Sequence, residues 1–294
     1  MTEDLYPTRT GTGPSFIHRA DPVAHGSASD GPLSAGDLVR FDANGFHSFD
    51  QLVEPGEVAA FRAELDRLSS DATMKADERT IIEPNSREVR SIFEVHKVSD
   101  VFAALLSDSR VVGPARQILG SDVYIHQSRV NFKPGFAGNN FFWHSDFETW
   151  HAEDGMPRMR AVSMSIALTE NLDSNGPLMI MPGSHRTFVS CPGETPADHY
   201  KSSLRSQEIG TPDDDSLRTL AEKHGIQQFT GLAGSATLFD CNCMHGSNSN
   251  ITPFPRSNVF VVFNSVENTL VEPFAATAPR PGFVAARDFT PLTR

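Results

Sequence analysis

The residues with the clearest chemical potential are His144, Asp146 and His245, of which the first two are separated by a single serine. Alternate residues of a strand point to the same face, so His144 and Asp146 can direct two ligand atoms toward one point. Two imidazoles and one carboxylate form the facial triad that binds Fe(II) and leaves positions open for substrate and O₂. The spacing therefore predicts an iron site of the oxygenase type.

An arginine follows the distal histidine. Arg256 stands just before the apolar run 259–263, where a guanidinium can hold a carboxylate through two parallel hydrogen bonds. A bound 2-oxo acid presents such a carboxylate. The triad and this arginine together predict Fe(II) as cofactor and a 2-oxo acid as cosubstrate.

Two other sets of residues compete for the role of metal ligand. Cys241, Cys243 and His245 alternate along an expected strand over 235–245 and offer a thiolate site for zinc or copper. Small free cysteines are also common in cores, and we favour that interpretation. His185 is the alternative third ligand, but it follows His144 too soon for a barrel in which several strands intervene. We expect His185 to be a turn residue at the edge of the site.

The elements that must position these residues are mostly short strands, punctuated by Gly, Pro and Asn. We predict strands over 123–133, 141–147, 160–170, 177–181, 235–245 and 257–265. This pattern is typical of a mainly β fold with flanking helices, a double-stranded β-helix of the jelly-roll or cupin-like barrel type. Helices are predicted over 55–68, 100–119 and 215–223, and the first two should pack on the outside of a sheet.

Composition sets the domain boundaries and excludes several partners. Residues 1–35 are rich in Gly, Ser, Pro and Thr, which predicts a mobile tail that orders only against the body, and 36–294 are expected to form a single domain. The long polar stretch 191–228 is a candidate lid. Lys and Arg number 25 against 37 Asp and Glu, a net charge of −12, which argues against nucleic acid or a membrane as partner.

The chain contains no apolar run of transmembrane length and no signal-peptide core, so we expect a cytoplasmic protein. Its three cysteines, an odd number, do not make a disulfide framework.

Strand parity selects the residues that face the site. Gln127, Arg129, Asn131 and Lys133 share one face of the strand 125–133, and that face is either solvated or lines a polar pocket. The same counting places Phe239 on the face of His245, and it places Phe260 on the face of Arg256. Sequence alone assigns no role to Arg129 or to the histidines 96, 126 and 151.

The segment 141–157, which reads Phe-Phe-Trp-His-Ser-Asp-Phe-Glu-Thr-Trp-His-Ala-Glu-Asp-Gly-Met-Pro, closely resembles the diagnostic segment of ectoine hydroxylases. These are Fe(II)/2-oxoglutarate dioxygenases of the phytanoyl-CoA hydroxylase superfamily. The run 178–185 and the spacing from His245 to Arg256 match that superfamily too. The resemblance extends from about Gly36 to the C-terminus.

The resemblance implies roles for individual side chains. Lys133 and Arg256, with Asn131 and Ser247, would bind 2-oxoglutarate, and Gln127 would contact ectoine. Ectoine carries a cationic amidinium ring, and Trp150 with Phe239 and Phe260 would enclose it through cation–π attraction of about 0.5–2 kcal/mol. From sequence alone, Trp150 fits equally well as a packing residue.

The reaction implied is hydroxylation of ectoine to 5-hydroxyectoine with O₂, releasing succinate and CO₂, for compatible-solute synthesis under osmotic stress. Asp146 disfavours a related halogenase, in which a small residue replaces the carboxylate. The same chemistry on proline, a zinc cupin-type enzyme and a non-catalytic jelly-roll binder remain as alternatives. The assembly, with a homodimer as one option, stays open.

Overall fold

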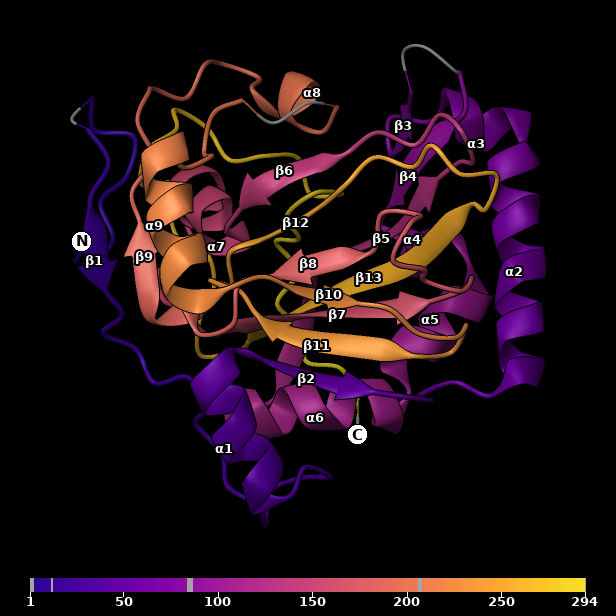
Figure 1. Ribbon diagram of the computed structural model, residues 1–294, viewed down its shortest axis with the longest axis horizontal. Helices are drawn as coiled ribbons and strands as arrows, with labels where there is room; N and C mark the ends of the chain where they lie inside the picture. Colours follow the sequence, from indigo (N-terminus) through magenta and orange to yellow (C-terminus); the bar gives the residue numbers. More distant parts are fainter. Residues whose placement is uncertain (1–2, 12, 84–86, 206–207, 294) are drawn as a thin grey trace.

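The computed structural model describes residues 3–11, 13–83, 87–205 and 208–293 (Figure 1). Within these ranges the chain forms three antiparallel sheets. The larger sheet has the strand order β2-β11-β7-β13-β5-β4-β3 and the smaller sheet the order β10-β8-β12-β6. The two sheets are the halves of the predicted barrel, so the mainly β jelly-roll prediction is confirmed.

The larger sheet consists of β2 (Phe46–Phe49), β3 (Thr80–Ile82), β4 (Val89–Phe93), β5 (Val123–Lys133), β7 (Ala161–Ala167), β11 (Ala236–Asp240) and β13 (Arg256–Ser265). The smaller sheet consists of β6 (Phe141–His144), β8 (Leu178–Ile180), β10 (Gln227–Phe229) and β12 (His245–Ser247). A separate pair joins β1 (Phe16–His18) to β9 (Thr187–Val189).

The helices are α1 (Ala35–Asn44), α2 (Pro55–Ser70), α3 (Ala72–Ala76), α4 (Val95–Val98), α5 (Asp100–Ser107), α6 (Ser109–Leu119), α7 (Asp146–Thr149), α8 (Tyr200–Ser203) and α9 (Asp214–His224). A π-helical turn, Trp150–Asp154, continues α7, and a 3₁₀ turn covers Ser184–Arg186. In Figure 1, α2, α5 and α6 lie beside the larger sheet. Their apolar faces join the outward-facing residues of β5, β7 and β13 in one large core.

The predicted helix over 100–119 is wrong in one respect, because the structure divides it in two at Asp108. This residue is extended, with φ −61° and ψ 138°, and its side chain caps α6 by accepting the backbone N–H of Arg110. An Asp side chain that bonds the backbone two residues later favours a cap over the interior of a helix. Gly120 ends α6 at φ 60°, in the left-handed conformation expected of a glycine stop.

Two predicted strands are shorter than expected, and both changes affect the site. The strand predicted over 141–147 ends at His144, and Asp146 is the first residue of α7. The strand predicted over 235–245 ends at Asp240, and the chain turns before β12 begins at His245. The alternation of ligands along one strand was therefore the wrong local description, although the ligands still converge.

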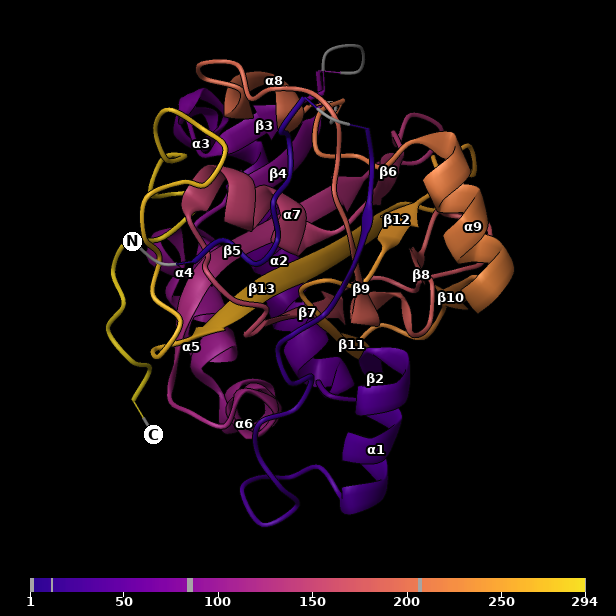
Figure 2. The ribbon, with the colours of Figure 1, turned by 90° about the vertical axis from the view of Figure 1, so that its left-hand side faces the viewer.

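Several residues of the N-terminal segment are buried against the body. Tyr6 is fully buried, the guanidinium of Arg9 is ion-paired with Glu148 at 2.8 Å, and that of Arg19 with Asp240 at 2.8 Å. Figure 2 shows this indigo segment passing close to α7 and β9. Composition predicted a tail that orders against the body and did not indicate these buried arginines.

No helix in the described ranges is both long and apolar enough to cross a lipid bilayer.

Candidate functional site

The structure brings His144, Asp146 and His245 together at one end of the barrel. Their ligand atoms all lie within 4.8 Å of one another. Nε2 of His144 lies 3.6 Å from Oδ1 of Asp146, and Nε2 of His245 lies 3.9 Å from Oδ2. The two histidines are direct register partners on β6 and β12. One metal ion can therefore be reached by both imidazoles and the carboxylate.

The backbone and one hydroxyl hold the three ligands in orientation. Nδ1 of His144 lies 2.6 Å from the carbonyl oxygen of Phe142, and Nδ1 of His245 lies 3.0 Å from that of Cys243. Because a carbonyl only accepts, each Nδ1 donates and each Nε2 keeps its lone pair for a metal. The hydroxyl of Ser163 donates to Oδ2 of Asp146 at 3.3 Å.

The electrostatics of the triad suit a divalent cation. Burial raises the pKa of Asp146, but His245, His144 and the guanidinium of Arg129 outweigh it, so this pKa lies well below its ordinary value. Burial, followed by the neighbouring His144, lowers the pKa of His245 to about 4. An ionised carboxylate and a neutral imidazole are the forms that bind a metal. The donor set thus fits Fe(II).

Two cavities meet at the triad. The inner one is small, about 30 Å³, and both triad histidines line it together with Arg129, Asn131, Phe141, Leu178, Gly246, Ser247, Arg256 and Phe260. The outer one has a volume of about 350 Å³ and is lined by His144 and Asp146 with, among others, Gln127, Arg129, Asn131, Thr149 and Trp150.

Arg256 is the most informative residue of the inner cavity. Its side chain is almost completely buried, and its Nε and Nη1 have no hydrogen-bond partner among the described residues. Burial lowers the pKa of this guanidinium to about 10. A buried, unpaired cation is costly, and a carboxylate in the cavity would remove that cost through charge-assisted hydrogen bonds. The cavity therefore fits the acid end of a 2-oxo acid.

Asn131 lines the same cavity from β5, and Lys133, on the same strand, contacts one of its lining residues, Ser247. Nζ of Lys133 donates to the hydroxyl of Ser247 at 2.8 Å and to the carbonyl of Asn248. Burial, followed by the charge of Arg256, lowers the pKa of Lys133 to about 6. Asn131 lines both cavities, and its Oδ1 accepts the hydroxyl of Ser91 at 2.8 Å. Three of the four side chains expected to bind the cosubstrate, Asn131, Ser247 and Arg256, thus line the inner cavity, and the fourth, Lys133, contacts Ser247.

The outer cavity contains two of the residues expected to bind the substrate. Trp150 is buried yet lines the cavity, and its ring lies edge-on to that of His126 with centroids 5.2 Å apart. The amide of Gln127 is already occupied: its Nε2 donates to the carbonyl of Val284 at 2.6 Å, and its Oε1 accepts from Arg129. Gln127 therefore orients Arg129 at the cavity wall.

The two phenylalanines differ in position. Phe260 lines the inner cavity, and the guanidinium carbon of Arg129 lies 5.2 Å from its ring centroid. Phe239 is in the core with Leu178, and its ring lies behind His245, with centroids 5.1 Å apart. Parity placed Phe239 on the pocket side, but its ring supports a triad histidine and lines neither cavity.

The competing metal sites do not form. Cys241 and Cys243 lie in the turn before β12, and burial raises the pKa of both thiols well above the ordinary value. The thiol of Cys243 donates to the carbonyl of Gly45 at 3.3 Å. His185 is buried in a 3₁₀ turn with its Nε2 bonded to the carbonyl of Asp42. All three residues are structural.

Sequence reasoning missed Arg129 and the ion cluster beside the site. Arg129 lines both cavities, and parity was the only signal that pointed to it. Glu148 and Glu153 are buried and both pair with Arg9. Asp154 pairs with Arg280 at 2.6 Å. Nothing local in the sequence indicates these distant partners.

The unassigned histidines are packing residues. His96 lies 2.6 Å from the hydroxyl of Ser128, and His151 bonds the carbonyl of Met156. His126 supports the ring of Trp150.

Comparison with known proteins agrees with this geometry. Residues 10–258 match the phytanoyl-CoA dioxygenase (PhyH) family. The chain is 64% identical over 290 residues to the ectoine dioxygenase of Streptomyces coelicolor, covering 98% of this chain and 97% of that protein. It is 53% identical over 294 residues to the ectoine dioxygenase of Stutzerimonas stutzeri, covering 99% and 97%.

Solved structures give the same picture. The crystal structure of EctD from S. alaskensis with 2-oxoglutarate and 5-hydroxyectoine has a TM-score of 0.90 to this chain at 47% identity, covering 99% of this chain and 97% of that one. A structure of the same protein with bound Fe has a TM-score of 0.88, with the same identity and coverage. This chain, with its paired histidines and single carboxylate at the barrel mouth, is thus a member of the phytanoyl-CoA dioxygenase family.

Proposed function

We propose that the protein hydroxylates ectoine to 5-hydroxyectoine, consuming 2-oxoglutarate and O₂ and releasing succinate and CO₂. The observation that carries the proposal is the buried guanidinium of Arg256, whose Nε and Nη1 have no hydrogen-bond partner among the described residues and which lines the same inner cavity as His144 and His245. Full-length similarity to ectoine dioxygenases supports the choice of substrate. The product would serve as a compatible solute under osmotic stress.

The triad His144, Asp146 and His245 would hold Fe(II). When bound, the iron supplies the oxygen chemistry that no protein side chain offers. The protein contributes orientation: the backbone carbonyls fix both imidazoles, and Ser163 fixes the carboxylate.

The far carboxylate of 2-oxoglutarate would bind in the inner cavity. There it would meet Arg256 and Ser247, and Lys133 would act from its position beside Ser247. Asn131 supports this end of the cavity from β5. An anionic ligand removes the cost of the buried guanidinium and favours protonation of Lys133, which a neutral ligand cannot do.

The outer cavity would bind ectoine. Ectoine is a zwitterion, so its amidinium ring needs an aromatic face and its carboxylate needs a cation. Trp150 offers the first and Arg129 the second, and the latter is held in place by the side-chain oxygen of Gln127. Phe260 closes the boundary with the inner cavity, and Phe239 acts indirectly by supporting His245.

The cavity wall also limits access of water. Ser203, Leu204 and Arg205, at the end of α8, line the outer cavity within the long polar segment expected to act as a lid. His199 fastens this segment, because its Nδ1 lies 2.8 Å from a carboxylate oxygen of Glu153. A covered cavity strengthens every charge interaction inside it.

We further propose that 36–294 form one catalytic domain and that the protein works in the cytoplasm as a homodimer. The acidic balance of the chain, a net charge of −12, supports the location. Light scattering after size-exclusion chromatography tests the assembly: a mass of one chain would contradict the homodimer.

Anaerobic reconstitution tests the activity. The protein is loaded with Fe(II), mixed with 2-oxoglutarate and either ectoine or proline, and then exposed to O₂. We expect succinate release to be strongly stimulated by ectoine, with product gaining one oxygen atom by mass spectrometry. Efficient turnover of proline with inert ectoine would contradict the substrate. Full activity with Zn(II) and no 2-oxoglutarate would contradict the reaction class.

A further inference from the structure

One amide joins the two chain segments that carry the metal ligands. Asn242 lies buried in the turn between β11 and β12, and its Oδ1 accepts the hydroxyl of Ser145 at 2.9 Å. Its Nδ2 donates to the carbonyls of His185 at 2.9 Å and Thr187 at 3.2 Å. The amide oxygen and the amide nitrogen are therefore both hydrogen-bonded. The oxygen is bound to the segment that carries His144 and Asp146, and the nitrogen to the segment 185–187.

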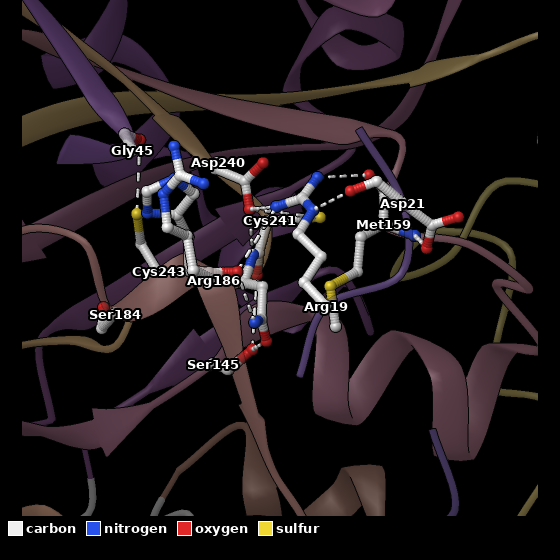
Figure 3. A network of polar contacts seen from close by, with 12 residues as sticks. Arg19, Asp21, Gly45, Ser145, Met159, Ser184, Arg186, Asp240, Cys241 and Cys243 are labelled. Atoms are coloured by element: carbon white, nitrogen blue, oxygen red, sulfur yellow. Dashed lines mark hydrogen bonds and ion pairs between the residues drawn. The ribbon is translucent and has the colours of Figure 1, made fainter. Parts of the chain in front are cut away.

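A buried ion pair between Arg19 and Asp240 holds the backbone of Asn242 in place. The backbone N–H of Asn242 donates to Oδ1 of Asp240 at 2.8 Å, and the guanidinium of Arg19 contacts the same oxygen at 2.8 Å. Arg19 also donates to the carbonyl of Met159 at 2.7 Å. Figure 3 shows Arg19, Asp240 and Ser145 in one continuous network. The turn that holds Asn242 is thus anchored to the body by charge.

The network contacts residues that are adjacent to the metal ligands in the sequence. Ser145 is the residue between His144 and Asp146, so the Asn242 bond acts on the center of the ligand pair. In the same turn, the carbonyl of Cys241 accepts a hydrogen bond from the backbone N–H of Phe147 at 2.9 Å. Two residues further on, the carbonyl of Cys243 orients the ring of His245. A shift of this turn would therefore move all three ligands relative to one another.

We propose that Asn242 is a positioning residue for the metal centre, setting the separation between the His144–Asp146 pair and His245 through its bond to Ser145. The inference rests on the proposed role of the triad in holding Fe(II). It assigns Asn242 a function beyond packing, because outer hydrogen bonds that orient metal ligands change metal affinity by about tenfold to a hundredfold when lost.

A matched asparagine elsewhere separates this role from plain stability. Asn268 is also buried, and its side chain likewise makes three hydrogen bonds: Nδ2 donates to the carbonyl of Arg158 and to Oδ1 of Asn264, and Oδ1 accepts the N–H of Arg158. Both Asn242→Ala and Asn268→Ala should lower the melting temperature of the metal-free protein. Only the first touches the segments that carry the ligands.

The test measures Fe(II) affinity anaerobically by calorimetry for the full-length protein and both variants. We expect Asn242→Ala to weaken Fe(II) binding about tenfold to a hundredfold, and Asn268→Ala to leave it within about twofold of the parent. The absorption spectrum of bound Co(II), which reports ligand geometry, should change only in Asn242→Ala. Equal weakening in both variants, or unchanged affinity in Asn242→Ala, would overturn the inference.

Ser145→Ala provides the second variant should Asn242→Ala fail to fold. It removes one hydroxyl, and we expect a several-fold loss of Fe(II) affinity with an altered Co(II) spectrum. Unchanged affinity and spectrum in Ser145→Ala would overturn the inference as well. Failure of the parent protein to bind Fe(II) would instead contradict the proposed function, so the two failures are distinguishable.

Discussion

Arg256 and Lys133 face each other as register partners on the antiparallel strands β13 and β5. Both side chains are almost completely buried. Two cations that face each other inside a barrel are costly unless an anion joins them, and burial together with Arg256 lowers the pKa of Lys133 to about 6. This pairing makes the inner cavity sensitive to the charge of its ligand.

Binding of 2-oxoglutarate should take up a proton at Lys133. At pH 7.5 the free protein holds this amine mostly neutral, because its pKa is about 6. A bound carboxylate raises that pKa, so the complex binds a proton and affinity should fall as pH rises above about 6. Calorimetry in two buffers of different ionisation enthalpy measures the uptake, and Lys133→Met should abolish it. A binding enthalpy independent of the buffer would contradict the prediction.

Arg256→Gln should raise the 2-oxoglutarate requirement more than the ectoine requirement. A charge-assisted hydrogen bond contributes about 1.5–3 kcal/mol, so the apparent KM for 2-oxoglutarate should rise roughly tenfold to a hundredfold. Initial rates with each substrate varied in turn measure the two effects. The exposed Arg218→Gln serves as control. A rise in the ectoine KM alone would place Arg256 in the substrate site.

His245→Ala should abolish hydroxylation and strongly weaken Fe(II) binding, because one of three protein ligands is lost. His144→Ala and Asp146→Ala should likewise abolish hydroxylation and weaken Fe(II) binding. His185→Ala is the matched control, since this buried histidine bonds the carbonyl of Asp42 and lies outside the triad. Metal content after anaerobic loading and gel filtration is the measurement. Iron retained by His245→Ala but lost from His185→Ala would overturn the ligand assignment.

Trp150→Leu should impair ectoine turnover more than Trp150→Phe, because a cation needs an aromatic face rather than bulk. Loss of a cation–π contact of about 0.5–2 kcal/mol corresponds to a KM for ectoine raised by roughly twofold to thirtyfold. Both variants should keep Fe(II) and 2-oxoglutarate binding. Gln127→Ala should also raise the ectoine KM, because Arg129 loses its acceptor. Equal KM and kcat values for ectoine in the Leu and Phe variants would contradict a cation–π contact at Trp150.

Arg9→Met should destabilise the protein by about 3–5 kcal/mol, because it leaves two buried carboxylates without their cation. Arg9 contacts Glu148 at 2.8 Å and Glu153 at 2.6 Å, and all three side chains are buried. Urea unfolding measures the loss. Arg40→Met, which breaks an exposed pair with Asp37, should cost less than about 1 kcal/mol. Similar losses in both variants would show that the buried cluster adds no special stability.

The sequence predicts well where a regular strand does the positioning. Gln127, Arg129 and Asn131 all line the outer cavity, because β5 is long and the parity of a strand is a local property. The same counting relates Arg256 to Phe260 on β13, and both side chains line the inner cavity. Parity places Phe239 beside His245, as found, but its ring lines neither cavity. Where the chain leaves regular structure, parity fails, because the turn after Asp240 removes Cys241 and Cys243 from the counting.

The failures concern partners that are distant in sequence. The carboxylates Glu148 and Glu153 pair with a cation that lies about 140 residues earlier in the chain. Their partner, Arg9, belongs to a segment whose Gly-rich composition gave no sign of burial. Local composition describes the chain before folding, whereas an ion pair depends on which surfaces the completed fold brings together.

The two N-terminal arginines have a consequence for how the enzyme is made. Arg19 leaves the ribosome long before its partner Asp240 has been added, a wait of roughly ten to forty seconds at about 5–20 residues per second. During that time Arg19 lacks its ion-pair partner. The metal centre, braced through Arg19 and Asp240, is therefore among the last features to be completed. The rate at which active enzyme appears in the cell is therefore limited by the completion of whole chains.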